Sequence, residues 1–124
     1  MIFSEILTNR TTALPNDSNF ISIKKLEALP SGSCLSIDME DRGIALFNVD
    51  GAVHALDNTC PHAGGPLGEG TVEGDEVICP WHGWKFHIPT GICRKNPNPS
   101  WNVQRYEVRI VDGVIQVALP PKTD

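Results

Sequence analysis

Two short stretches constrain this chain more than any other part of its sequence. The stretches CPHAGGPL and CPWHGW each hold one cysteine and one histidine close together, spaced Cys60-x-His62 and Cys79-x2-His82. Thiolates and imidazoles are common ligands of transition metals. Glycine and proline surround both pairs, which places them on loops. We therefore predict a fold in which two loops leave strand ends and meet at one tip, around a shared metal site.

Length and charge limit what else the chain can be. It has 124 residues, the size of one ordinary domain, and its 40% hydrophobic content is typical of globular proteins. The net charge of −5 argues against nucleic-acid binding, because phosphates require basic residues. Mild acidity is compatible with docking onto a basic surface of a partner protein.

The cellular location follows from what the N-terminus and the apolar runs lack. No apolar run approaches the roughly 20 residues of a bilayer span, so no membrane contact is expected. The first residues contain Glu5 and lack the positively charged start of a signal peptide, so we expect a cytoplasmic protein. There, cysteines serve as metal ligands or free thiols rather than disulfides. Cys34 and Cys93, outside the two stretches, are expected to be small core residues.

Short apolar or alternating runs separated by turn residues predict an all-β domain. The expected strands are residues 20–23, 34–38, 43–49, 52–57, 76–79, 84–88, 103–111 and 114–119. Residues 1–19 show no clear periodicity of apolar residues and are interpreted as an N-terminal arm. Residues 20–124 are then the domain. The helical candidate, residues 24–29, is followed by Pro30 and should form no more than a turn.

Two Asp-Gly pairs predict tight hairpins. Asp50-Gly51 and Asp112-Gly113 each lie between two strand-like runs. A two-residue hairpin turn needs positive φ, which glycine and aspartate tolerate. These hairpins are expected to form the part of the domain that lies outside the metal site.

The order of the ligands favours an iron–sulfur cluster over zinc. Zinc fingers pair cysteine with cysteine and histidine with histidine, whereas here each stretch supplies one of each. In a binuclear [2Fe–2S] centre, one iron can collect both cysteines and the other both histidines. Flanking glycines allow close approach of the backbone to a bulky cluster, and prolines stiffen the loops. A zinc site remains the alternative.

At this point the sequence resembles the Rieske ferredoxins. The resemblance rests on Cys60-Pro61-His62, on CPWHGW, and on the flanking ALFNVDGAVHALDNT, TGIC and VDGVIQVAL segments, and it covers roughly residues 20–120. It implies three stacked antiparallel sheets with one [2Fe–2S] cluster at the tip. Cys60 and Cys79 would ligate the inner iron, and His62 and His82 the outer iron near the surface. A proline-containing third loop, residues 96–100, would cover the cluster.

The sequence also departs from the high-potential members of that family. Those proteins have an extra cysteine in each loop, forming a disulfide, at positions interpreted here as Gly64 and Trp81. They also have a serine donor where this chain has Trp84. Fewer donors to the sulfides stabilise the added electron less, so the low-potential, oxygenase-linked type is expected. His54 and His87 lack ligand spacing and are expected to be ordinary strand or surface residues.

The resemblance implies an electron carrier. The leading hypothesis is a ferredoxin that takes single electrons from a flavin-dependent reductase and passes them to a terminal Rieske oxygenase. The alternatives are the small subunit of an assimilatory nitrite reductase and a structural or regulatory metal-binding module, including a zinc form. No nucleophile–base pair or phosphate loop is visible, so no catalytic residue and no enzyme activity of its own are expected.

Overall fold

The computed structural model of the chain describes residues 20–39 and 42–119. The predicted arm, residues 1–19, lies outside the described residues. The described part is mostly strand, as the sequence predicts, with three short 3-10 turns. None of its helices is long and apolar enough to cross a bilayer.

The described residues contain nine strands. They are β1 Phe20–Lys25, β2 Cys34–Met39, β3 Arg42–Val49, β4 Ala52–Asp57, β5 Thr71–Glu73, β6 Glu76–Ile78, β7 Lys85–His87, β8 Arg105–Val111 and β9 Val114–Ala118. Each expected strand is present to within one or two residues at its ends. The helical candidate is a single 3-10 turn, η3 Leu26–Ala28, as expected for so short a segment.

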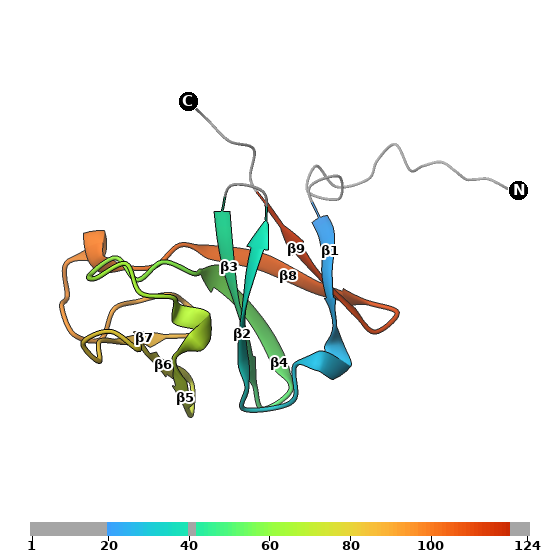
Figure 1. Ribbon diagram of the computed structural model, residues 1–124, viewed down its shortest axis with the longest axis horizontal. Coiled ribbons are helices and arrows are strands. Elements are labelled where there is room, and N and C mark those ends of the chain that lie inside the picture. The colour runs from blue at the N-terminus through green and yellow to red at the C-terminus, as the bar shows by residue number, and fades with distance from the viewer. Residues whose placement is uncertain (1–19, 40–41, 120–124) are drawn as a thin grey trace, which may run out of the picture.

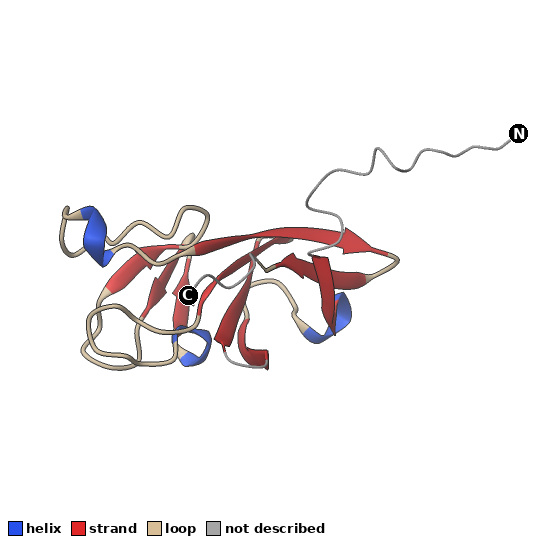
Figure 2. Cartoon of the chain, turned by 90° about the horizontal axis from the view of Figure 1, so that it is seen from above, coloured by secondary structure: helices blue, strands red, loops and turns tan. Residues whose placement is uncertain are grey.

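The strands form a larger and a smaller sheet (Figures 1 and 2). One sheet has the order β1-β9-β8-β4-β3-β2, and a smaller sheet has the order β5-β6-β7. All of the pairings are antiparallel. The larger sheet is two groups of three strands joined where β4 pairs with β8 through Ala55–Tyr106 and Leu56–Arg105. The three expected sheets are therefore present as three groups, two of which are fused along this short seam.

Both Asp-Gly hairpins are confirmed. Asp50 and Gly51 have φ of 52° and 93° between β3 and β4, and Asp112 and Gly113 have φ of 52° and 76° between β8 and β9. Positive φ at both central residues matches the right-handed twist of the flanking strands. These turns fix the register of the larger sheet.

The core has two parts, and one of them contains the metal-ligand candidates. The first cluster of buried side chains includes Cys60, Cys79 and Cys93 together with Phe47 and Phe86. The second lies between the β1–β9–β8 group and β2–β3 and is aliphatic, with Tyr106 at its edge. Cys93 is buried as expected, whereas Cys34 is half-buried and packs against the first cluster. The two loops therefore start from inside a packed core.

His54 gives the domain a predicted pH dependence. This half-buried residue lies on β4, where burial, followed by Arg105 and His87, holds its pKa below the usual 6.5. Below pH 6.5 the unfolded chain thus binds a proton that the folded chain does not. We expect the stability of the domain to fall as the pH drops from 6.5 towards the folded pKa, and this contribution to be flat above 6.5.

The measurement is urea unfolding of the wild type and His54→Gln at pH 7.5, 6.5 and 5.5. The substitution should reduce the acid-side loss of stability, while losses from other groups remain in both proteins. An identical loss in the two proteins would contradict the assignment to His54.

Candidate metal centre

The two loops predicted to hold a metal have the same shape. Residues 60–65 and 79–84 both read Cys-Pro-x-x-Gly-x. In the first, the Cys60 N–H donates to the carbonyl of Gly65 at 2.9 Å, and the Gly64 N–H donates to that of Cys60 at 2.7 Å. In the second, Cys79 and Gly83 make the equivalent bonds at 2.8 and 3.3 Å. The loops differ in that the histidine is the third residue of the first and the fourth of the second.

Backbone conformation explains why glycine occupies the fifth position of each loop. Gly64 has φ of 80° and Gly83 has φ of 74°, in the left-handed region that side chains with a Cβ rarely adopt. His82 also has positive φ, at 74°. Histidine is one of the non-glycine residues enriched there, and such conformations concentrate at functional sites. This turn aims the His82 side chain outward from the loop.

The two cysteines form the inner part of the site. Cys60 and Cys79 are each 1% exposed, and neither is in a disulfide. Their thiols are close enough to hydrogen-bond one another, and the Trp81 N–H donates to Cys79 Sγ at 3.4 Å. Burial raises the pKa of the Cys79 thiol; the Trp81 N–H opposes this and the Cys60 thiol adds to it. Two facing, buried thiols of this kind need a cation to be stable as thiolates.

The two histidines form the outer part. His62 and His82 are exposed, and their ring centroids lie 5.4 Å apart at an angle of 76°. The structure thus places the two thiols beside one another inside the core and the two imidazoles beside one another at the surface. Among the described residues, no group of three or more Cys, His, Asp or Glu side chains is placed to hold one metal ion.

Two tryptophan rings, Trp84 and Trp101, lie beside His62 and are called here the aromatic wall. The Trp84 ring is stacked on the His62 ring at 3.9 Å and 5°, and Trp101 meets Trp84 edge-on at 5.4 Å and His62 at 6.3 Å. Both tryptophans pack against the first core cluster. The wall fixes the orientation of the His62 ring and covers one side of the site. Trp101 was not predicted from the sequence; its position two residues after the Pro97-Asn98-Pro99 stretch was the available signal.

Trp101 directly follows the predicted third loop, residues 96–100, and lies outside its predicted bounds. It ends a 3-10 turn, η5 Pro99–Trp101, whose first N–H is capped by the side chain of Asn98. At the base of the loop, the Cys93 N–H donates to Asn102 Oδ1 at 2.9 Å, and the Val103 N–H donates to the Gly91 carbonyl at 2.8 Å. The segment is therefore closed at its base, and it places the Trp101 indole against His62 and Trp84 of the first two loops.

Asn58 anchors the first loop, which sequence reasoning also missed. Its Oδ1 accepts from the Gly68 N–H at 2.7 Å and from Ser36 Oγ at 3.1 Å, and its carbonyl accepts from the Leu67 N–H at 2.8 Å. The 3-10 turn η4 Leu67–Glu69 is thereby held against β2. This single side chain ties the exit of the loop to the larger sheet.

One predicted position needs correction. Trp81 faces Gly65 rather than Gly64: a Cβ on Gly65 would lie 2.8 Å from Trp81 Cγ, whereas one on Gly64 meets nothing within 4 Å. The position across from Trp81, where a disulfide would join the loops, is therefore Gly65. The conclusion that this chain lacks that bridge is unchanged, since neither residue is cysteine.

The other two histidines lie on strands, as expected. His54 is on β4, and His87 ends β7, where its ring bonds Thr90 Oγ1 at 2.7 Å and Asp75 Oδ2 at 3.0 Å. Neither belongs to the four-residue site.

The donor set fits a centre with two metal positions. Two buried sulfur atoms lie on the core side and two imidazoles on the solvent side, each loop supplying one of each. Such a set matches a binuclear cluster with two cysteines on one iron and two histidines on the other.

Comparison with known proteins gives consistent matches. Residues 19–108 match the model of the Rieske [2Fe-2S] domain. The ferredoxin component of the naphthalene 1,2-dioxygenase system of Pseudomonas aeruginosa is 33% identical over 91 residues, which is 73% of this chain and 86% of that protein.

Two solved structures are similar over most of their length. A chain in a complex of reduced oxygenase and oxidized ferredoxin in carbazole 1,9a-dioxygenase has a TM-score of 0.76 and 25% identity, over 87% of this chain and all of that one. A putative NADH-dependent nitrite reductase small subunit from Mycobacterium tuberculosis has a TM-score of 0.73 and 28% identity, over 83% and 96% of the two chains.

Proposed function

This chain belongs to the Rieske [2Fe–2S] domain family, and from that premise we propose that it is a one-electron carrier of an oxygenase system, taking electrons from a flavin-dependent reductase and delivering them to a terminal Rieske oxygenase. Relatives at similar length are ferredoxin components of dioxygenase systems. A Rieske domain carries one [2Fe–2S] cluster, which when bound accepts and returns one electron.

The ligands in this proposal are the four residues of the two loops. Cys60 and Cys79 hold the inner iron as thiolates, and His62 and His82 hold the outer iron through ring nitrogens. Two ferric ions and two sulfides carry two positive charges, which two thiolates cancel and neutral histidines leave unchanged. An all-cysteine set is two charges more negative, which explains why Rieske centres accept electrons more readily than plant-type ferredoxins.

The observation that supports electron transfer most directly is the difference in exposure between the two ligand pairs. The thiols are 1% exposed, whereas both imidazole rings reach the surface. An electron can leave through His62 or His82 to a docked partner, while Trp84 and Trp101 exclude water from one side. No residue of the chain needs to bind a substrate for this role.

The domain and its location follow from the same proposal. Residues 20–124 form the Rieske domain, with residues 1–19 as an additional arm. The protein acts in the cytoplasm, with protein redox partners and no nucleic-acid or membrane partner.

The nitrite reductase alternative shares the fold, as the mycobacterial neighbour illustrates. The oxygenase reading is preferred because the curated relatives that match most of their own length are dioxygenase ferredoxins. Membership of the Rieske family argues against a zinc-binding module, because domains of this family bind a [2Fe–2S] cluster.

Two measurements test the proposal. Anaerobically purified protein should contain about two irons and two labile sulfides per chain, and the reduced form should give an EPR signal of mixed His/Cys ligation. Reduced protein should then be reoxidised on mixing with naphthalene 1,2-dioxygenase and its substrate. Bound zinc without labile sulfide would exclude the carrier; reoxidation by a nitrite reductase large subunit, but by no oxygenase, would favour the alternative.

The reduction potential is predicted to lie near the low end of the Rieske range, at roughly −150 mV. The site has neither the loop disulfide nor the serine donor of high-potential members, because Gly65, Trp81 and Trp84 stand there, while the Trp81 N–H remains as a donor to Cys79 Sγ. Protein-film voltammetry at pH 7 measures it. A potential well above zero would mean that other donors reach the sulfur atoms.

A further inference from the structure

The three loops near the metal-ligand candidates carry positive formal charge, whereas the chain as a whole is negative. The three loops, residues 60–65, 79–84 and 93–102, contain Arg94 and Lys95 and no aspartate or glutamate, and Lys85 follows the second loop directly. The whole chain has a net charge of −5. The nearest acidic residue after the first loop is Glu69, in the η4 turn.

These three cations line a cavity next to the second loop. The cavity has a volume of about 250 Å³ and is lined by Gly83, Lys85, Arg94 and Lys95. Gly83 directly follows His82 in the chain, so the cavity is lined in part by the same loop that carries one of the two exposed rings. We call these four residues the basic pocket.

The charges of the basic pocket are available to a partner. Lys85 Nζ is 3.8 Å from Glu73, and both side chains are about half exposed, an arrangement that contributes little attraction. Arg94 uses only Nε, one of its five donor N–H groups, to bond Glu76 at 3.1 Å. Lys95 is exposed and makes no ion pair with any residue that the structure describes.

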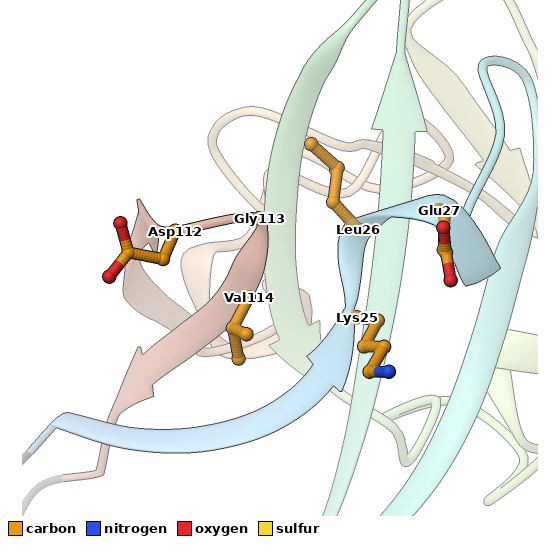
Figure 3. Close-up of a pocket in the computed structure, with 6 residues that line it drawn as sticks. All are labelled: Lys25, Leu26, Glu27, Asp112, Gly113 and Val114. Atoms are coloured by element: carbon orange, nitrogen blue, oxygen red, sulfur yellow. The ribbon is translucent and has the colours of Figure 1, made fainter.

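A second cavity of about 480 Å³ provides the contrast (Figure 3). It lies between β1 and the β8–β9 turn, on the other side of the molecule from the loops (Figure 1). Its lining mixes Lys25 with Glu27 and Asp112, so it offers no single sign of charge. It complements neither an acidic nor a basic surface.

We propose that the basic pocket is the docking site for a carboxylate-bearing surface of the redox partner, which it draws against His82. This inference rests on the proposed role as an electron carrier. It differs from the expectation, drawn from the negative net charge, that the chain docks onto a basic partner surface. Attraction at close range depends on the charges nearest the contact rather than on the net charge. Complementary charges would act mainly by speeding encounter and orienting the exit ring towards the acceptor.

Small charged redox reagents test the sign of the charge around the basic pocket without a partner protein. Reduced protein gives one electron to ferricyanide, which becomes ferrocyanide, and stopped-flow absorbance follows the oxidation. Although both reactants are negative overall, we expect the rate to fall as salt is added, because a basic tip attracts the anion. At about 10 mM ionic strength, where screening extends to about 30 Å, Lys95→Glu should slow the reaction roughly tenfold.

Lys25→Glu is the matched control, because it changes the net charge equally but lies in the distant cavity. It should change the ferricyanide rate less than about twofold, because the Coulomb interaction weakens with distance and Lys25 lies far from the loops. A Lys95→Glu rate within twofold of the Lys25→Glu rate, or a wild-type rate that rises with salt, would overturn the proposal. Visible absorbance of the cluster checks that both variants are loaded.

Hexacyanochromate(III) separates this inference from the proposed function, because it has the charge of ferricyanide but accepts no electron. It should broaden the NMR signals of the Lys95 side chain before those of Lys25. If this broadening is seen but the reduced protein delivers electrons to no oxygenase, the proposed function is overturned. The basic pocket would then remain as a docking site for anions. Equal broadening at both lysines would overturn the docking site itself.

Discussion

Replacing Cys60 or Cys79 by serine is expected to abolish cluster binding almost completely. Both thiols are buried and face one another at the inner end of the site, so each is placed to bind the same iron. A serine hydroxyl is a harder and far less acidic ligand than a thiol, and it cannot replace a soft thiolate on iron. Iron and sulfide content, visible absorbance and EPR should all fall to background in either variant.

The larger sheet should survive the same substitutions. Its hairpins turn at Asp50-Gly51 and Asp112-Gly113, both outside the loops. Hydrogen exchange should therefore become fast in residues 60–65 and 79–84 while β3, β4, β8 and β9 stay protected, because ligation no longer joins the two loops.

Cys34→Ser is the matched control for this experiment. Cys34 Sγ donates to the Gly70 carbonyl at 3.4 Å, a bond that a serine hydroxyl can also make, and Cys34 lies outside both loops. It should retain the full cluster content. A Cys60→Ser or Cys79→Ser protein with normal iron and sulfide would show that the assigned ligands are wrong.

Gly91→Ala is expected to destabilise the domain strongly, because it combines a steric collision with a left-handed backbone conformation. Gly91 has φ of 79°, and an added Cβ would collide with the backbone carbonyl of Val103. Because that carbonyl is main chain, it cannot rotate away, and the Val103 N–H bond to Gly91 would be lost. We expect a loss of about 3 kcal/mol or more, seen as a fall of roughly 10 to 20 °C in Tm.

The substitution should also affect the site, because Gly91 closes the base of the loop that carries Trp101. Displacing this loop removes the edge-on contacts of Trp101 with His62 and Trp84. We therefore expect the cluster of Gly91→Ala to be lost faster on exposure to a chelator than that of the wild type.

Gly32→Ala separates steric collision from backbone strain. Gly32 has a similar φ of 85°, but a Cβ there meets nothing within 4 Å. It should cost only the left-handed penalty of about 1 to 2 kcal/mol and leave chelator resistance unchanged. Equal destabilisation by the two substitutions would contradict the steric argument for Gly91.

Sequence patterns predicted the features that depend on local chemistry. Alternating apolar runs predict strands, and Asp-Gly between two runs predicts a turn with positive φ, because both effects operate over a few residues. The spacing of Cys60, His62, Cys79 and His82 led to the prediction of one shared site, which stays a prediction. The structure brings them together as two pairs at different depths.

The features that were missed depend on contacts between distant segments. Strand β5 is three residues long and is held by β6 rather than by its own propensity. The pairing of β4 with β8 joins residues about fifty positions apart in the sequence. No pattern of neighbouring residues could have predicted this pairing. The stacking of Trp84 on His62 and the approach of Trp101 arise only when the third loop folds over the first two.

The matching shape of the two loops bears on how fast electrons can move. Each loop is closed by its own main-chain hydrogen bonds, which involve neither the metal nor the other loop. The ligands are therefore held at fixed positions before and after the charge of the site changes, with proline at the second place of each turn to stiffen it. Little atomic motion should accompany oxidation or reduction, which means a small reorganisation energy. A carrier of this kind can exchange electrons rapidly in either direction when the potentials of its donor and acceptor differ only slightly.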